Sequence, residues 1–292
     1  VFVKHENHLP TGAFKVRGGL NFMHHFAASV PAAGTEAHTH AGVITATRGN
    51  HGQSIGFAAA RHGIPAAVVV PHGNSPGKNA AMRALGVELI EEGHDFQASL
   101  EAAERIAAAR GWHMVPSFDE PLVRGVASYS LELLRAVPDL DTVYVPIGLG
   151  SGICGAIAAR DALGLPARIV AVVAASAPAY AQSLAAGSPV SREATTRIAD
   201  GMACRTPVPA ALDTIRKGID RVVQVSDDEI EDAMRAIYDD THNVAEGAAA
   251  ASLAALLQER DRARGRQVAI VLTGANVDAA TFGRILSGGR AE

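Results

Sequence analysis

Cysteine is nearly absent from this 292-residue sequence, and no apolar run reaches the length of a membrane span. The two cysteines, Cys154 and Cys204, lie far apart, so they form neither a zinc-ligand cluster nor a disulfide framework, and they suit a reducing compartment. The first thirty residues lack the uninterrupted apolar core of a signal peptide. We therefore expect a cytoplasmic protein without redox chemistry and without a membrane partner.

Charge is modest and lysine is scarce. Charged residues make up 19% of the sequence and the net charge is −4, so no basic surface for nucleic acid is expected. The chain has only four lysines, and its other basic residues are arginines. The lysines are Lys4, Lys15, Lys78 and Lys217. Each lysine is therefore worth considering as a functional residue.

Apolar segments rich in valine and isoleucine alternate with alanine-rich segments of helical length. The strand-like segments are 43–46, 66–70, 87–90, 143–146, 169–174 and 268–272. Between the first three strands and after them, helices are expected at 53–62, 77–85 and 96–110. Strands that alternate with helices predict an α/β fold with mostly parallel sheets, and 292 residues suit one large domain or two medium ones.

One of the four lysines lies in an unusual context. Lys15 stands among small and apolar residues, directly after a Pro-Thr-Gly turn and before an expected helix. Burial lowers the pKa of a lysine amine, and a neutral amine can attack an aldehyde to form a Schiff base. From this context alone, a surface lysine at a helix start is an equally open interpretation.

Glycines follow the strand 143–146 and precede an alanine-rich helix. Gly148-Leu149-Gly150-Ser151-Gly152 would place free backbone N–H groups and a helix N-terminus where they can bind a phosphate. Residues 150–155 also satisfy the dinucleotide pattern G-x-G-x-x-G. A dinucleotide site should have an acid at the end of the next strand, and residues 172–176 contain none. A single phosphate-bearing cofactor is therefore favoured over a dinucleotide, with a structural glycine turn as the alternative.

Two further strand ends carry polar groups. Residues 45–52 are dense in hydrogen-bond donors before a helix, which suits a carboxylate, while Asn50 offers an amide to a phenolic oxygen. An ordinary helix cap by Asn50 is the alternative. Thr273 ends the buried-looking strand 268–272 and would also suit a plain strand end.

Together these four segments resemble, in order and type, the serine/threonine dehydratase family of fold-type II pyridoxal 5'-phosphate (PLP) enzymes, over nearly the whole chain. The family's P-T-G-[SA]-F-K-x-R-G motif is specific and matches Pro10–Gly18. Its S-x-G-N-H-x-Q loop matches Thr47–Gln53, and its phosphate loop matches Gly148–Gly152. Its strand-end hydroxyl, which faces the pyridine nitrogen, matches Thr273.

The resemblance implies roles for these residues. Lys15 would hold PLP as a Schiff base and, once substrate takes its place, would remove the α-proton as general base. A neutral hydroxyl at the ring nitrogen would make the cofactor a milder electron sink and favour elimination over transamination. The implied cofactor-binding residues are Phe14, Lys15, Asn50, Gly148, Leu149, Gly150, Ser151, Gly152 and Thr273. The implied substrate-binding residues are Thr47, Arg48, Gly49, Asn50 and His51.

The resemblance also implies an α/β fold of fold type II, the class of the tryptophan synthase β subunit, with two open, parallel-type sheets. Residues 1–40 and 119–292 would form a large cofactor-binding domain, and residues 41–118 a small domain with the substrate loop. Family members are commonly dimers, so we expect a homodimer. Relatives extend before the Lys4 strand, so the chain looks truncated at its start, and its end leaves no room for an appended regulatory domain.

The sequence departs from the family pattern at three places. Arg48 stands where racemases of the family place a serine base, and a guanidinium cannot serve as a base, so racemase activity is not expected. Metal-dependent relatives carry a Glu at the position of Ala174 and an Asp shortly after it, and neither is present, so no metal is expected. Glu246 matches the family's E-P-A-G segment with Gly247 in place of proline, and its role stays open.

The sequence therefore predicts a PLP-dependent ammonia-lyase that eliminates water and ammonia from L-threonine or L-serine to give a 2-oxo acid. One alternative, motivated by Arg48, is a dehydratase for another 3-hydroxy amino acid, such as phenylserine or hydroxyaspartate. A nicotinamide-dependent oxidoreductase and an inactive truncated homologue are the remaining alternatives.

Overall fold

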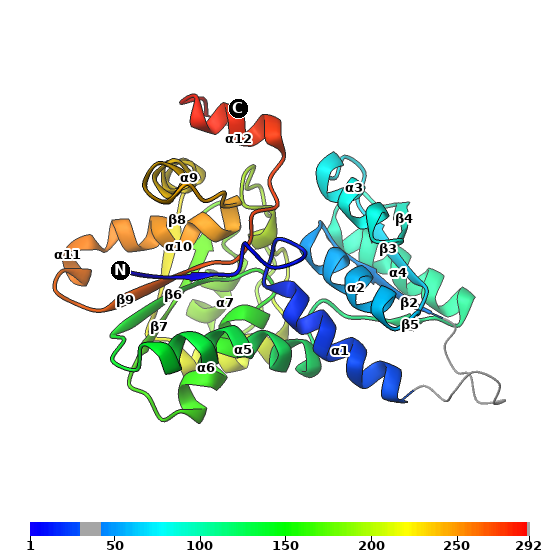
Figure 1. Ribbon diagram of the computed structural model, residues 1–292, viewed down its shortest axis with the longest axis horizontal. Helices are drawn as coiled ribbons and strands as arrows, with labels where there is room; N and C mark the ends of the chain where they lie inside the picture. Colours follow the sequence, from blue (N-terminus) through cyan, green and yellow to red (C-terminus); the bar gives the residue numbers. More distant parts are fainter. Residues whose placement is uncertain (30–41, 291–292) are drawn as a thin grey trace. The chain divides into compact units, whose positions relative to one another are not determined.

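The structure, a computed structural model, describes residues 1–29 and 42–290. Its contacts divide the chain into two compact units (Figure 1). Unit 1 combines Val1–Phe14 with Val126–Glu292, and unit 2 is Lys15–Gly125. Unit 2 thus begins earlier than the small domain expected at 41–118, and the boundary expected at 40–41 lies outside the described residues. The domain limits inferred from the sequence stay a prediction.

Unit 1 contains a five-stranded parallel sheet with the strand order β1-β9-β6-β7-β8. The strands are β1 (Phe2–His5), β6 (Thr142–Pro146), β7 (Arg168–Ala174), β8 (Arg221–Val225) and β9 (Val268–Leu272). The central strands β6, β7 and β9 are almost continuously apolar and buried, as expected for parallel strands covered on both faces. All strands run the same way, so β6 and β9 present their carboxyl ends at one edge of the sheet.

Helices cover both faces of this sheet. The helices of unit 1 are α5 (Glu120–Ala136, whose first turns belong to unit 2), α6 (Ser151–Ala162), α7 (Ala179–Ala186), the 3-10 helix η1 (Asp200–Met202), α8 (Pro209–Gly218), α9 (Asp227–Thr241), α10 (Gly247–Gln258), α11 (Arg260–Ala263) and α12 (Ala279–Leu286). Helix α10 packs against β6 to β9 on one face, and α6 packs against β6 and β7 on the other (Figure 1). Helix α9 begins at a capping box made by Ser226 and Glu229.

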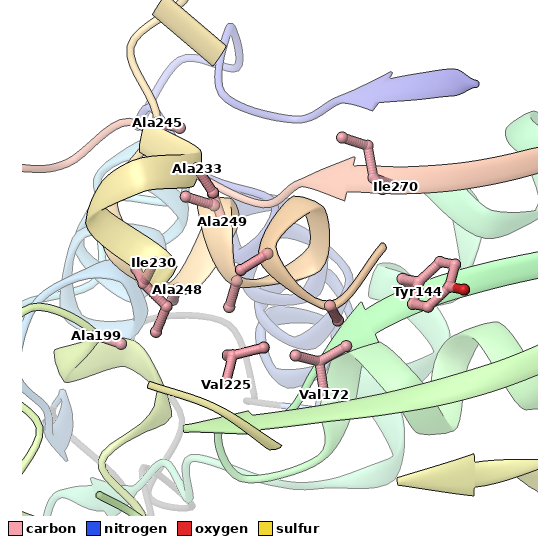
Figure 2. Close-up of a cluster of buried hydrophobic side chains, with 14 of the residues drawn as sticks. Tyr144, Val172, Ala199, Val225, Ile230, Ala233, Ala245, Ala248, Ala249 and Ile270 are labelled. Atoms are coloured by element: carbon pink, nitrogen blue, oxygen red, sulfur yellow. The ribbon is translucent and has the colours of Figure 1, made fainter. Parts of the chain in front are cut away.

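The main core of unit 1 lies between the sheet and helices α9 and α10. Figure 2 shows Val172 and Val225 of the neighbouring strands β7 and β8, and Ile270 of β9, among the buried side chains of this core, with Ala249 of α10 beside Ala233 of α9. The small alanine side chains let α10 approach the sheet closely, which explains why this helix is nearly all alanine and leucine.

Unit 2 contains a four-stranded parallel sheet with the order β4-β3-β2-β5. Its strands are β2 (Val43–Ala46), β3 (Ala66–Val70), β4 (Glu88–Glu91) and β5 (His113–Met114), and its helices are α1 (Lys15–Ser29), α2 (Asn50–Arg61), α3 (Pro76–Ala84) and α4 (Phe96–Arg110). Alternate residues of β2 and β3 enter two cores. Val43, Val68 and Val70 pack on the side of α1, α2 and α3, whereas Ile44 and Val69 pack against α4.

The expected α/β fold with two parallel sheets is confirmed. Strands β2, β3 and β9 have the expected limits, and β4 begins and ends one residue later than expected. The sequence did not indicate β5, which has only two residues, or β8, which is only partly buried because it lies at the sheet edge. Among the described residues, no helix combines the length and apolar character that a membrane span requires.

Candidate functional site

Lys15 is the first residue of α1 in unit 2, and its position is fixed through helix α2. The Lys15 carbonyl accepts a 2.6 Å hydrogen bond from the Ser54 hydroxyl. One turn further along α1, a Cβ at Gly19 would lie 2.2 Å from that same hydroxyl oxygen. Only glycine therefore lets α1 approach α2 closely enough to hold the backbone of Lys15 in place.

The Lys15 amine lies in a buried environment, although the side chain as a whole is half-buried. Burial lowers the pKa of this amine from 10.5 to about 8, because the charged form loses its hydration. A lysine with this pKa provides a substantial neutral fraction near neutral pH. Its amine can therefore act as a nucleophile or as a base.

The Thr47–His51 loop of unit 2 connects β2 to α2. Gly49 donates its N–H to the Thr47 hydroxyl at 2.9 Å, and a Cβ at Gly49 would lie 2.5 Å from Cδ of Lys78. The loop therefore passes directly over the buried stem of Lys78, which only glycine permits. The first amides of α2, which begins at Asn50, lie in this loop, where a helix favours an anion.

His51 is buried in this loop and is held neutral. Burial and the nearby Lys15 lower its pKa to about 3, against the opposing effect of hydrogen bonds to the backbone of Val115 and Pro116. Among the described residues, Nε2 of His51 and Nε2 of Gln53 have no hydrogen-bond partner although both are buried. Buried polar atoms without partners are rare in a protein interior, so these two atoms indicate a site that a polar ligand completes.

Arg48 lies in the same loop and is half-buried. It makes no hydrogen bond or ion pair with another residue of the described ranges 1–29 and 42–290. A guanidinium can bind a carboxylate, and the role of Arg48 in substrate binding that the sequence suggested stays a prediction.

In unit 1, the glycine loop Gly148–Gly152 follows β6 and leads into α6. Gly150 has a φ of 105°, and a Cβ there would lie 2.8 Å from Cβ of Ala211. A Cβ at Gly148 would lie 2.3 Å from the Gly201 carbonyl oxygen. Both positions therefore require glycine, and the loop offers backbone N–H groups at the N-terminus of α6, which suits a phosphate.

Two other segments of unit 1 meet at this loop. The Phe14 N–H donates to the Thr273 carbonyl at 2.9 Å, and Ala13 pairs with Gly274 in an antiparallel bridge. The Phe14 ring stands edge-on to Tyr129, and the Tyr129 hydroxyl donates to the Gly152 carbonyl at 3.3 Å. Unit 1 thus gathers Phe14, Thr273 and the loop, and the peptide bond after Phe14 leads to Lys15.

Glu246 joins the same region of unit 1. Its N–H donates to the Gly274 carbonyl at 3.0 Å, and a Cβ at Gly274 would lie 2.7 Å from its carboxylate oxygen Oε1. The side chain is buried. The sequence named Glu246 without a role, and the structure places it beside the strand end that carries Thr273.

The predicted residues fall into two sets. Unit 2 brings Lys15 together with the loop of Thr47, Arg48, Gly49, Asn50 and His51. Unit 1 brings Phe14 together with Gly148, Leu149, Gly150, Ser151, Gly152 and Thr273. Sequence reasoning missed Tyr129 and Tyr180, whose hydroxyls bind this loop, because nothing in their local sequence marks them.

A family model described as "Pyridoxal-phosphate dependent enzyme" matches residues 1–274. The chain belongs to this family. Its members use a single phosphate-bearing cofactor, so the choice between such a cofactor and a dinucleotide is decided for PLP. An L-threonine ammonia-lyase of Geobacter sulfurreducens is 37% identical over 290 residues, covering 99% of this chain and 70% of the relative.

Two further comparisons agree with this assignment. An L-threonine ammonia-lyase of Thermotoga maritima is 33% identical, with the same coverage of both chains. The crystal structure of a pyridoxal 5'-phosphate-dependent aspartate racemase matches with a TM-score of 0.88 and 28% identity, covering 96% of this chain and 85% of that chain. The similarity therefore extends along nearly the whole chain in both sequence and structure.

The residues of this PLP enzyme fit its cofactor. Amide donors around Gly150 suit a phosphate, and the Lys15 amine, whose lowered pKa increases its neutral fraction, suits an aldehyde. Thr273 supplies a neutral hydroxyl at the end of β9. Among residues 1–29 and 42–290, no group of three histidine, cysteine, aspartate or glutamate side chains is arranged to hold a metal ion.

Proposed function

We propose that the chain is a PLP-dependent ammonia-lyase that eliminates water and ammonia from L-threonine and L-serine and releases a 2-oxo acid. The observation that carries the choice of reaction is the similarity, over 99% of this chain, to two enzymes named L-threonine ammonia-lyase. The lowered pKa of Lys15, at the position where the family motif has its lysine, supports the presence of a working catalytic amine.

The residues that would hold PLP come from both sets described above. Lys15 would bind it covalently through Nζ, and Asn50 would hydrogen-bond its phenolic oxygen. The amides of Gly148–Gly152 would hold its phosphate, and Phe14 and Thr273 would line its ring. When bound, PLP supplies an electron sink for the charge that develops as an amino acid loses its α-proton.

The chain's own groups would do the remaining work. The Lys15 amine, with its pKa near 8, is suited to remove the α-proton as general base. The loop of Thr47, Gly49 and His51 would orient the substrate carboxylate through hydroxyl and amide donors at the start of α2. Because His51 stays neutral, it would orient the substrate without competing for the proton.

A second candidate function is a dehydratase for a 3-hydroxy amino acid with an acidic side chain. The specific observation in its favour is that Arg48 is half-buried and has no ion-pair partner among the described residues. A guanidinium in such a position binds a carboxylate well. Arg48 also argues against racemisation, because it cannot act as a base at the place where racemases of the family have a serine.

The deciding experiment measures 2-oxo acid release by the PLP-loaded protein from four substrates offered separately. The substrates are L-serine, L-threonine, L-threo-3-phenylserine and L-threo-3-hydroxyaspartate. Turnover of threonine and serine is the expected result. Preference for hydroxyaspartate would establish the second candidate, and no release from any of the four would contradict both.

We further propose that the protein acts as a homodimer in the cytoplasm. Both cysteines are free and buried, which suits a reducing compartment. Light scattering coupled to size-exclusion chromatography tests the dimer, and a single species with the mass of one chain would contradict it.

A further inference from the structure

Tyr180, on helix α7 of unit 1, binds the Gly148–Gly152 loop through its hydroxyl group. Its hydroxyl donates to the Leu149 carbonyl at 2.8 Å and accepts the N–H of Val208 at 3.3 Å. Tyr180 is buried, with 2% of its surface exposed, and both hydrogen bonds lie within unit 1. The hydroxyl therefore joins the centre of the loop to the residue that precedes α8.

The hydrogen bond from Tyr180 to the Leu149 carbonyl also affects the N–H group of the next residue, because both belong to one planar peptide bond. In a trans peptide, the carbonyl of one residue and the N–H of the next point in opposite directions, and the described chain contains no cis peptide bond. The Leu149 carbonyl and the Gly150 N–H belong to one peptide plane. By binding the carbonyl, Tyr180 fixes the direction of the Gly150 N–H, which points away from the tyrosine.

Two neighbouring groups lie close to Gly150. A Cβ at Gly150 would lie 3.3 Å from the Tyr180 hydroxyl oxygen and 2.8 Å from Cβ of Ala211. Burial raises the pKa of Tyr180 well above its ordinary value, so the phenol stays protonated and keeps donating to the loop.

We propose that Tyr180 is a positioning residue, which fixes the peptide between Leu149 and Gly150 so that the loop's N–H groups are preset for the cofactor phosphate. The inference rests on the proposed function, which assigns the Gly148–Gly152 loop to the phosphate. Tyr180 touches neither substrate nor cofactor in this role and acts only through the loop.

The experiment compares the affinity of the apo-protein for PLP with its affinity for pyridoxal, which lacks the phosphate. Tyr180→Phe removes the hydroxyl and keeps the ring. Tyr144→Phe is the matched control, because Tyr144 is a buried tyrosine of the same unit whose hydroxyl donates to Glu259 instead. Gly150→Ala disturbs the loop directly.

For Tyr180→Phe we expect the dissociation constant for PLP to rise roughly tenfold, while that for pyridoxal stays unchanged. The ³¹P resonance of PLP bound to this variant should also shift relative to wild type. Tyr144→Phe should match wild type in both affinities. Gly150→Ala should weaken PLP binding by at least as much as Tyr180→Phe and leave pyridoxal binding unchanged.

The other possible outcomes separate a failure of the inference about Tyr180 from a failure of the proposed function. If Gly150→Ala leaves PLP affinity unchanged, the loop is not the phosphate site, and the assignment in the proposed function fails together with the inference. If Gly150→Ala weakens PLP binding but Tyr180→Phe does not, only the role of Tyr180 is overturned. A Tyr180→Phe protein that fails to fold, or that loses affinity for both ligands equally, gives Tyr180 a general packing role and also overturns the inference.

Discussion

The two loops that follow β6 and β2 are built in different ways. The Gly148–Gly152 loop consists of backbone held from outside, since Tyr129 and Tyr180 bind its carbonyls and neighbouring atoms occupy the space of a Cβ added at Gly148 or Gly150. The Thr47–His51 loop instead carries polar side chains, among them a half-buried arginine and a neutral, buried histidine.

This difference matches the ligands that the two loops would bind. A phosphate is the same in every PLP enzyme, so a rigid backbone site serves it without side-chain choice. A substrate differs between enzymes, and side chains such as Arg48 can be changed without rebuilding the fold. We infer that specificity lies in the loop of unit 2, whereas the loop of unit 1 has little freedom to vary.

Substitution of Lys15 is expected to have the largest effect on activity. Lys15→Ala should lower 2-oxo acid release at least about a thousandfold, because it removes both the amine that would hold PLP and the proposed base. Circular dichroism should show an unchanged fold, since the hydrogen bond from Ser54 goes to the backbone of residue 15. Retention of substantial turnover would remove Lys15 from the mechanism.

Gly148, the first residue of the Gly148–Gly152 loop, should not tolerate even one added methyl group. Gly148→Ala would place a Cβ 2.3 Å from the Gly201 carbonyl, and we expect it to lower the free energy of unfolding by about 2–4 kcal/mol. Gly283→Ala is the control, because a Cβ there meets nothing within 4 Å and it lies in helix α12. Urea unfolding of both apo-proteins measures the difference, and equal stabilities would show that the loop can relax.

The sequence was informative where chemistry leaves a local signal. The run of small residues around Lys15 and the glycines at 148–152 are visible as patterns, and so are the central strands, whose apolar character is continuous. The sequence did not predict contacts between distant positions on which function also depends. The hydrogen bond from Tyr180 to Leu149 and the contact of Glu246 with Gly274 follow from tertiary packing, which no local pattern encodes.

Substitutions in the Thr47–His51 loop should leave the fold intact and change which substrate the enzyme prefers. Arg48→Met is expected to lower kcat/KM for L-threo-3-hydroxyaspartate about tenfold relative to that for L-threonine, because it removes a cation available to a second carboxylate. Arg61→Met is the control, since Arg61 is exposed at the C-terminal end of α2, the helix that follows the Thr47–His51 loop, and stacks on Phe57. An unchanged ratio for Arg48→Met would place the substrate side chain elsewhere.

The smallest effect concerns the pH dependence of cofactor binding by the apo-protein. Only the neutral Lys15 amine can attack the aldehyde, and its pKa is lowered to about 8. The rate constant for PLP binding should therefore rise about tenfold per pH unit below pH 8 and level off above it. With an ordinary lysine, the rise would continue to about pH 10.4. Stopped-flow absorbance separates the two profiles, and a rise that continues beyond pH 9 would show that Lys15 is hydrated and that unit 2 does not tune its amine.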